Sequence, residues 1–567
     1  MAKHLALTIA GAVSLGSYES GVAFEILDAL SQHNQWANQN TVPDERIGID
    51  VLTGASAGGM TVSMIAQRLL FDGAAMNLPY DNPLYNAWVQ DIDISKLLAR
   101  SADESPTHSI FSSDCVIAIS ETYLKGRYQD SPPPPPLPHP ALSAGGKLQL
   151  GLALSNLNGV DYCRKTSSGG QFVYTDHQDQ LVLPLHAISD DRPELWETIR
   201  TAAVACGAFP FAFRVQDLAR NMVDYPSEFL VKELWGGNPS RRFTYTDGGV
   251  FQNEPLGMAK NLVELLPDGH LNALDRGYCF IAPQPKTSQE ILYTTDPAAD
   301  PSTAFGAAVA DYKVVLDRIA LSVIGQAGFQ DWIMAEDINK KLHLLDKRAD
   351  RLQNLFLNKT LTAAQTQPVS AALLQEFFQI DGTMTLTAKA NLDAARDQLR
   401  QQYASEYSCF GVDLTTADAW LDSVLILELA AGLHEKEEML IYDFVADATE
   451  LAGNGLDAFE GFFDVSYRKH DYDYGRSVAQ QKLRQYKAQP GSIFANLHWT
   501  PKPIDPIDPN LNHVDLSKVD ENKRQKVKDQ ICAAADGLLQ ELNVDFAARK
   551  IIEAAFVDGA VKKLLSL

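Results

Sequence analysis

Cysteine is scarce in this chain. It occurs six times among 567 residues, and no two cysteines form a Cys-x-x-Cys pair or a metal-ligand spacing. A reducing, cytoplasmic location is the simplest account, although few cysteines also suit a protein that a bacterium secretes or injects. Long apolar runs are absent as well, because no uncharged stretch approaches the roughly 20 residues that a membrane-spanning helix needs. We therefore expect neither a metal centre nor a membrane span.

Basic residues are outnumbered by acidic ones. The chain has 48 Lys and Arg against 72 Asp and Glu, which gives a formal net charge of -24. This excess argues against a nucleic-acid partner, and at long range it repels an anionic bilayer. The length of 567 residues exceeds the usual size of one hydrophobic core, so at least two packed units are expected.

A serine flanked by small residues is the first candidate for chemistry. The apolar run from Ile47 to Leu52 leads into Gly54-Ala55-Ser56-Ala57-Gly58, and a helical pattern begins near Gly59. This arrangement is typical of a nucleophile elbow, in which a strained turn exposes the serine and glycines allow close backbone approach. The free N–H groups of the first helical turn favour an oxyanion there.

A small-residue loop follows the first apolar run. Residues His4 to Ala10 form a short strand pattern and lead into the loop Gly11 to Gly16, after which a helix begins. The apolar start superficially resembles a secretion signal, but cleavage after it would remove the loop, so we interpret it as a core strand. The loop has no Lys at its end to meet a nucleotide phosphate, which disfavours nucleotide binding. Its backbone N–H groups can converge on another anion.

An aspartate ends a later strand pattern. Asp247 follows the run Arg242 to Thr246 and precedes Gly248 and Gly249, and a helical pattern starts at Pro255. A carboxylate within hydrogen-bond reach of Ser56 could accept its proton as a general base. A tight turn is the alternative interpretation of Asp-Gly-Gly.

Taken together, these three motifs resemble the patatin-like phospholipase family. The family combines a glycine-rich oxyanion loop, a Gly-x-Ser-x-Gly elbow and a later Asp-Gly-Gly or Asp-Gly-Ala, and the order here is the same. The resemblance extends to Asn253 and Pro255 and covers about the first half of the chain. It departs in the loop, where Ala12, Val13 and Leu15 stand and the usual basic residue is missing. That departure weakens the case for a phospholipid head group more than the case for acyl hydrolysis.

The resemblance implies a fold, a reaction and a set of site residues. The fold is a three-layer α/β/α domain with a central, mostly parallel sheet, followed by an α-helical C-terminal region. The reaction is hydrolysis of a lipid or other acyl ester by a Ser–Asp dyad, without a cofactor or metal. The implied catalytic residues are Ser56 and Asp247, with Gly54, Gly58, Gly248 and Gly249 in support, and the implied oxyanion hole comes from Gly11, Ala12, Val13, Ser14, Gly16 and Ala57.

Two alternatives stay open at this stage. A Ser–His–Asp hydrolase of another fold would need a late histidine, for which the candidates are His270, His343, His434, His470, His498 and His513. The elbow at residue 56 leaves little room for the strands that usually precede it in that fold. The second alternative is a patatin-like fold kept as a binding or scaffold module, which predicts no acyl transfer to Ser56.

The remaining pattern predicts the domain organisation. We expect the hydrolase domain at 1–290 with an insertion at about 75–145, an α-helical extension at 291–500, and a linker with C-terminal helices at 501–567. In the extension, apolar residues from Ile338 to Phe356 alternate spacings of four and three, which favours packing within a helical domain. The last helix has an apolar face from Ile551 to Leu565 that can contact a membrane peripherally or dock on the protein. The oligomeric state is not predicted.

Overall fold

The computed structural model describes most of the chain. The described residues are 3–102, 104–105, 108–130, 132–165, 170–225, 230–266, 275–283, 330–378, 386–432, 439–454, 458–512, 514 and 519–541. The chain divides into two compact units, one made mainly of 1–269 and 441–567 and the other mainly of 332–440. Each unit is described by itself.

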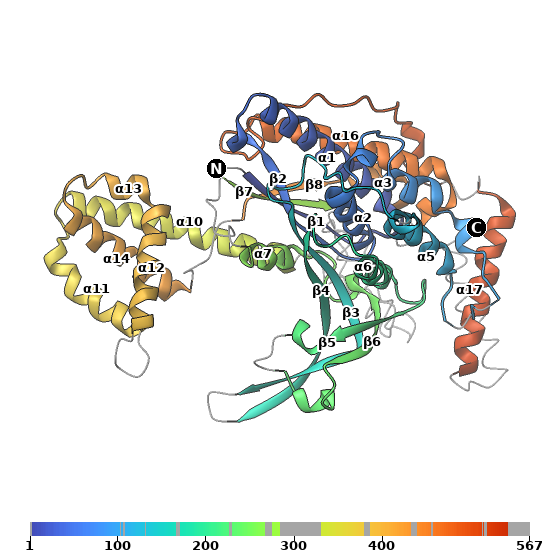
Figure 1. Cartoon of the computed structure of the whole chain (residues 1–567), viewed down its shortest axis with the longest axis horizontal. Helices are drawn as coiled ribbons and strands as arrows, with labels where there is room; N and C mark the ends of the chain where they lie inside the picture. The colour runs from blue at the N-terminus through green and yellow to red at the C-terminus, as the bar shows by residue number, and fades with distance from the viewer. Residues whose placement is uncertain are drawn as a thin grey trace, which may run out of the picture. The chain divides into compact units, whose positions relative to one another are not determined.

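The first unit is built on one mixed sheet (Figure 1). In the described part of the chain the strand order is β5-β6-β3-β2-β1-β7-β8, and β4 pairs with β3. Pairing is parallel from β3 through β2, β1 and β7 to β8, and antiparallel among β3, β4, β5 and β6. The strands are β1 (Lys3–Ile9), β2 (Ile47–Gly54), β3 (Lys147–Lys165), β4 (Gln171–His186), β5 (Gln216–Asn221), β6 (Ser240–Asp247), β7 (Arg276–Ala282) and β8 (Ile441–Val445).

Helices pack against both faces of this sheet. The described helices of the first unit are α1 (Gly16–Gln39), α2 (Ala57–Phe71), α5 (Asp114–Ser120), α6 (Pro193–Cys206), α7 (Leu256–Glu264), α16 (Val465–Lys487) and α17 (Glu521–Glu541), with the short α3 (Pro83–Tyr85) and α4 (Ile94–Leu97), and not all of them lie on the sheet. Short helical turns near the site are η1 (Val13–Leu15), η4 (Asn86–Asp91), η5 (Glu121–Lys125), η9 (Gly248–Val250), η12 (Ala452–Asn454) and η13 (Glu460–Phe463).

Chain direction assigns the helices to two layers. The chain moves from β1 through α1 to β2 and through α2 to β3 in one direction along the sheet, so right-handed crossovers place α1 and α2 on one face. After α7 the chain enters β7, which lies on the other side of β1. The helix α7 therefore covers the opposite face of the sheet. The side chain of Thr53 hydrogen-bonds the carbonyl of Pro255, just before α7, whereas the next residue, Gly54, packs on the first turn of α2. The predicted three-layer α/β/α fold is confirmed.

The burial of the two central strands β1 and β2 explains why their sequences are apolar. β2 is buried along its whole length, and β1 is buried over its last five residues. A strand that is covered on both faces is apolar at nearly every position, whereas a strand covered on one face alternates apolar and polar residues. This explains the apolar runs of β1 and β2 in the sequence. The carboxyl ends of β1 and β2 lie side by side at one edge of the sheet, and in open α/β sheets ligands bind at the carboxyl ends of the strands.

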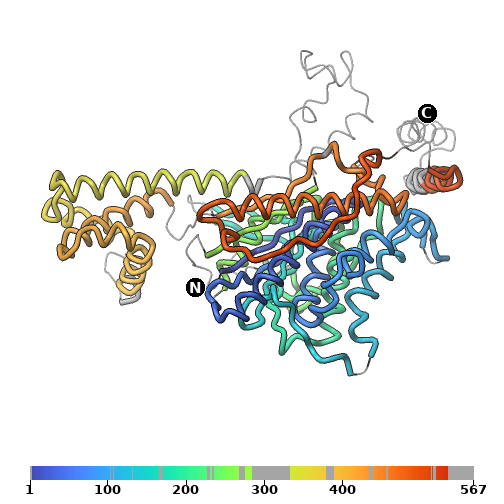
Figure 2. Tube along the Cα trace, turned by 90° about the horizontal axis from the view of Figure 1, so that it is seen from above, coloured from blue at the N-terminus to red at the C-terminus, as the bar shows by residue number. Residues whose placement is uncertain are grey.

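Within the range 291–500, where the sequence predicts a helical extension, the part from Ile441 onward belongs to the first unit. Strand β8 pairs in parallel with β7, and α16 lies alongside α1 (Figures 1 and 2). Arg476 on α16 forms a fully buried ion pair with Glu25 on α1, at 2.7 Å. A five-residue strand with only two buried positions has too little periodicity to be separated from the helices around it.

The second unit is helical. It contains α10 (Gln330–Leu357), α11 (Ala363–Phe378), α12 (Leu386–Gln402), α13 (Ala404–Ser408) and α14 (Leu414–Ala431). Its core surrounds Trp420, whose indole N–H donates to the carbonyl of Ala349 at 3.1 Å. The apolar stripe of α10 packs inside this unit, as the sequence pattern predicted.

Candidate active site

Ser56 occupies a strained turn between β2 and α2. Its backbone has φ 50° and ψ -127°, a conformation that a residue with a side chain rarely adopts. Such a conformation costs on the order of 1–3 kcal/mol and persists only where the surroundings enforce it. The strain turns the hydroxyl toward the carboxyl ends of the strands, and Ser56 stays only 6% exposed.

The glycines of the elbow allow three backbone segments to cross. A Cβ at Gly58 would lie 2.3 Å from the carbonyl oxygen of Ala10, and one at Gly54 would lie 2.5 Å from the carbonyl oxygen of Gly58. Gly248 is equally confined, since its Cβ would meet the carbonyl oxygen of Ala153 at 2.1 Å. Each of these neighbours is backbone, which cannot move aside cheaply.

Replacing Gly58 by alanine is expected to destabilise the domain by about 3 kcal/mol or more, because an added methyl group forces backbone shifts in a packed core. Gly126→Ala is a matched control, since the nearest atom to its Cβ is 4.0 Å away. Chemical denaturation measures both free energies of unfolding. A loss for Gly58→Ala no larger than that for Gly126→Ala would contradict this interpretation of the elbow.

Asp247 lies within hydrogen-bond reach of the serine. The Ser56 hydroxyl donates to Oδ2 of Asp247 at 2.6 Å, and the Gly249 N–H donates to Oδ1 at 2.7 Å. The strand register explains the meeting, because Asp247 on β6 pairs with Leu154 on β3, two residues beyond the β3 partner of Gly54. Two residues 191 positions apart in sequence are thus brought together.

The carboxyl of Asp247 is buried, with 1% exposed. Burial raises its pKa from the ordinary value of 3.8 to about 7, while the hydrogen bonds from Ser56 and Gly249 lower the pKa and partly oppose this rise. Asp247 is therefore a stronger base than an ordinary aspartate. A carboxylate with a pKa near 7 is a competent general base at neutral pH.

The loop after β1 carries a second strained residue. Val13 has φ 49°, an outlier for a β-branched side chain, and it faces the same cavity as Ser56 and Ala57. Gly11 lies under the elbow, where an added Cβ would be 2.9 Å from the Ser56 Cβ. Within the described residues the N–H groups of Ala12, Val13 and Ala57 have no hydrogen-bond acceptor.

Other groups of the loop between Gly11 and Gly16 contact the protein itself. The Gly11 N–H donates to the carbonyl of Asn253 at 3.0 Å, and the Gly16 N–H donates back into the turn η1. Gly16 packs against the indole ring of Trp88, and the Ser14 hydroxyl donates to the carbonyl of Ala458. Within the described residues, the N–H groups of Gly11 and Gly16 therefore have acceptors, whereas those of Ala12, Val13, Ser14 and Ala57 do not.

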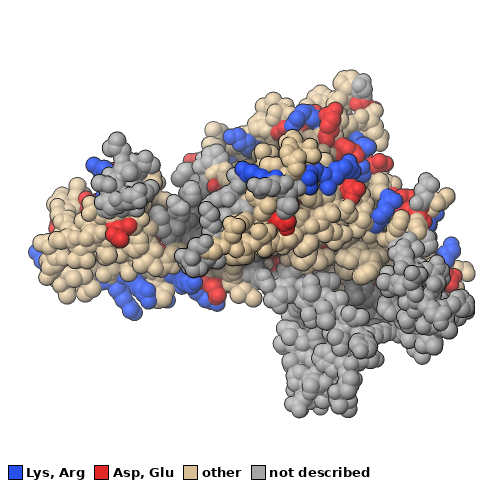
Figure 3. Space-filling model, turned by 90° about the horizontal axis from the view of Figure 1, so that it is seen from below, with Lys and Arg blue, Asp and Glu red and all other residues tan. Residues whose placement is uncertain are grey.

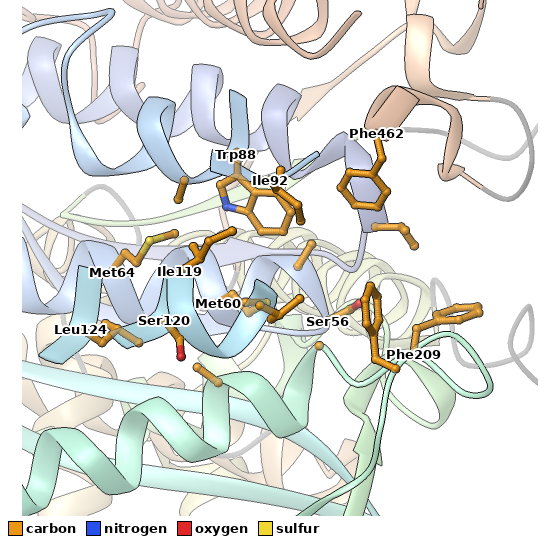
Figure 4. Close-up of a pocket in the computed structure, with 17 residues that line it drawn as sticks. Ser56, Met60, Met64, Trp88, Ile92, Ile119, Ser120, Leu124, Phe209 and Phe462 are labelled. Carbon is orange, nitrogen blue, oxygen red and sulfur yellow. The ribbon is translucent and has the colours of Figure 1, made fainter. Parts of the chain in front are cut away.

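An apolar cavity opens beside Ser56 (Figure 4). Its walls come from η1, α2, η4, α5, η5, α6, the loop after α6, and η13. The turns η4 and η5 are π-helical, a geometry that often occurs at functional sites. The lining residues are Val13, Ser56, Ala57, Met60, Met64, Ala87, Trp88, Ile92, Val116, Ile119, Ser120, Leu124, Ala203, Gly207, Phe209, Phe213 and Phe462.

Comparison with known proteins identifies the part of the chain that holds this geometry. Residues 7–260 match the family described as Patatin-like phospholipase, and this range contains the elbow, the loop and Asp247. Residues 7–260 form a patatin-like phospholipase domain. The description of this family names a phospholipase, which is a hydrolase of lipids. The chain is longer than the patatin domain and continues through the helical unit, β8 and α16.

A relative is similar to about half of this chain. An uncharacterised protein of Sinorhizobium fredii, y4iI, is 22% identical to this chain over 355 residues. The alignment covers 50% of this chain and 49% of that protein, so the similarity spans about half the length of the relative.

The histidines of the alternative triad lie elsewhere or outside the described residues. His470 contacts Asp471 on α16, and His498 stacks on the ring of Trp36. His343 lies on α10 in the second unit. The candidates His270, His434 and His513 are outside the described residues, as is the apolar face from Ile551 to Leu565.

Sequence reasoning missed most of the pocket wall around the patatin site. Trp88 comes from the insertion and Phe462 from beyond the family match, and neither lies near a catalytic motif. Nothing in the sequence around Phe462 indicates that its side chain lines the cavity beside Ser56.

Proposed function

We propose that this protein is a lipid acyl hydrolase, of the phospholipase A or lysophospholipase type, that cleaves carboxylic esters with a Ser56–Asp247 dyad. The hydrogen bond of 2.6 Å between the two side chains, at the edge of an apolar cavity, carries the proposal. The strain at Ser56 and the raised pKa of Asp247 support it.

The reaction follows from these positions in two halves. Asp247 accepts the Ser56 proton while Oγ attacks the ester carbonyl carbon, and the proton then passes to the leaving alcohol oxygen as the acyl-enzyme forms. Water next attacks the acyl carbon, with Asp247 again accepting a proton and returning it to Ser56. The N–H groups of Ala12, Val13 and Ala57 are the donors proposed for the oxyanion.

The cavity suits an acyl chain better than a head group. Its lining holds no charged side chain, and its polar side-chain atoms belong to Ser56, Ser120 and Trp88. Burial of apolar surface favours a hydrocarbon chain by roughly 25 cal/mol per Å². We therefore assign the cavity to the acyl chain and leave the head group outside it.

Access to lipid does not require a spanning segment. The described helices include none with an apolar stretch long enough to cross a bilayer. The face in Figure 3 carries both basic and acidic side chains, so it is not a uniformly acidic surface despite the net charge. The proposal includes a cytoplasmic location and peripheral contact with a neutral lipid surface.

A lipid panel tests the proposed activity. Purified protein is incubated with phosphatidylcholine, lysophosphatidylcholine and neutral acylglycerols, and mass spectrometry detects released fatty acid. We expect release from at least one class. If no acyl ester in the panel is cleaved, a binding or scaffold role for the fold replaces the enzyme proposal.

The pH dependence follows from the pKa of Asp247. Only the ionised carboxylate can accept the serine proton, so kcat/KM is expected to fall about tenfold per pH unit below a midpoint near 7. The profile of ester hydrolysis from pH 5 to 9 measures this midpoint. Full activity retained at pH 5 would contradict the role of Asp247 as the titrating base.

A further inference from the structure

One wall of the cavity comes from outside the patatin domain. Phe462, on η13, is 1% exposed and lines the cavity, although the family match ends at residue 260. Figure 4 shows its ring above Ser56 and facing Phe209, whereas Leu124 and Met64 lie at the other end. Phe462 is therefore placed near the carbonyl end of an acyl chain bound at Ser56.

Phe462 belongs to an aromatic cluster that joins the two parts of the chain. The ring of Phe459 lies 6.0 Å from that of Phe462 and 5.8 Å from that of Phe209. It also lies 5.6 Å from the ring of Phe111. Two phenylalanines of the patatin domain thus meet two from the C-terminal segment, and these contacts fix where Phe462 stands.

A buried arginine holds this wall in place. Arg468 on α16 is 1% exposed; its Nε donates to the carbonyl of Val89 at 3.0 Å, and its Nη1 donates to the carbonyls of Gly461 and Phe462 at 3.1 Å each. Val89 follows the cavity residue Trp88 on η4. One guanidinium therefore links the wall that holds Trp88 to the wall that holds Phe462. The planar guanidinium has donors that point in several fixed directions, whereas a lysine ammonium cannot reach all three carbonyls.

The same segment also contacts the loop beside the serine. The Ser14 hydroxyl donates to the carbonyl of Ala458, and a Cβ at Gly461 would lie 2.6 Å from the Ser14 Oγ. Asp471 on α16 accepts the N–H groups of Ala452 and Gly453 at 2.7 and 2.9 Å, which fixes the preceding turn η12. The segment thus has anchors on both sides of Phe462.

We propose that residues 458–468 form an acyl-selecting wall, in which Phe462 determines which acyl chains fit at Ser56 and Arg468 positions Phe462. The inference rests on the proposed function in assigning the cavity to acyl chains. A large ring beside the attacked carbonyl leaves room for a straight chain and excludes a branch next to the carboxyl carbon. A smaller residue there admits the branch and removes apolar contact from the straight chain.

The test measures binding in a Ser56→Ala background, so that it does not depend on turnover. Dissociation constants are determined for hexadecanoate and 2-methylhexadecanoate by displacement of a fluorescent fatty acid. Phe462→Ala is expected to shift the preference toward the branched acid by about tenfold or more. Phe463→Ala is the matched control, because Phe463 is also buried but does not line the cavity, and it should leave the preference unchanged.

Arg468→Lys tests the positioning role. It keeps the charge but cannot serve the three carbonyls together, so it should shift the preference in the same direction as Phe462→Ala while the protein stays folded by circular dichroism. An unchanged preference in Phe462→Ala, an equal shift in Phe463→Ala, or no binding of either acid would overturn the inference. A shift in preference in a protein that hydrolyses no ester would uphold the wall and refute the proposed function instead.

Discussion

Ester hydrolysis is expected to fall by roughly 10⁴ to 10⁶ in kcat when Ser56 is replaced by alanine, because the nucleophile that forms the acyl-enzyme is removed. Alanine keeps the strained backbone, so the free energy of unfolding should change little. Ser56→Gly should lose as much activity yet gain stability, since glycine adopts φ 50° without a steric penalty. Turnover and chemical denaturation of the three proteins measure both quantities.

A second buried serine of α2 provides the control. The Ser63 hydroxyl donates to the carbonyl of Gly59 at 2.8 Å and does not line the cavity. Ser63→Ala should cost about 1 kcal/mol of stability and leave hydrolysis near the wild-type rate. Equal losses of activity in Ser56→Ala and Ser63→Ala would show that the first loss reflects packing and not chemistry.

The second large effect is expected for Asp247→Asn, with kcat lowered by about 10² to 10⁴ because an amide cannot accept the serine proton. The amide oxygen can still accept the Gly249 N–H, so the local geometry should persist. Asp217→Asn, at an exposed aspartate on the neighbouring strand β5, is the matched control and should keep full activity. A fully active Asp247→Asn protein, together with an inactive histidine variant, would favour the Ser–His–Asp alternative.

At pH 8, Asp247→Asn is expected to be more stable than wild type although it is less active. The pKa of Asp247 is higher in the folded protein, about 7, than its ordinary 3.8, so the folded state retains a proton that the unfolded state loses between these values. The contribution of this group is fully present below pH 4 and is lost as pH rises through 7. Asparagine does not ionise, so at pH 8 the variant should melt at a higher temperature than wild type. A lower melting temperature for the variant would contradict the burial argument.

Local patterns in the sequence were sufficient for the elements that hold the two central residues. The apolar runs before Gly11 and Gly54 are strands buried on both faces, and the elbow requires glycine at Gly54 and Gly58 because an added Cβ would lie within 2.5 Å of neighbouring backbone oxygens. Asp247 was a candidate from its place at a strand end with glycines after it, and the resemblance to the family implied its role as the base. Its distance from Ser56 could not be read locally, because it depends on the register of β6 on β3.

Features that depend on distant contacts could not be predicted. The C-terminal return of β8 and α16 rests on pairing with β7 and on the buried ion pair of Arg476 with Glu25, and neither leaves a motif in the sequence. Burial alone raises the pKa of Asp247, and burial is a property of the whole fold. In the loop, composition could not indicate that the Gly11 N–H donates to the carbonyl of Asn253 while the N–H groups of Ala12 and Val13 have no acceptor among the described residues.

The most direct test of the dyad is labelling with a fluorophosphonate probe, followed by peptide mapping in a mass spectrometer. The probe forms a stable bond only with an activated serine. We predict one adduct, on Ser56, in the wild-type protein, none in Ser56→Ala, and labelling of Asp247→Asn slowed by about 100-fold or more. An unlabelled wild-type protein, an adduct on another serine, or labelling of Asp247→Asn at the wild-type rate would contradict the Ser56–Asp247 mechanism.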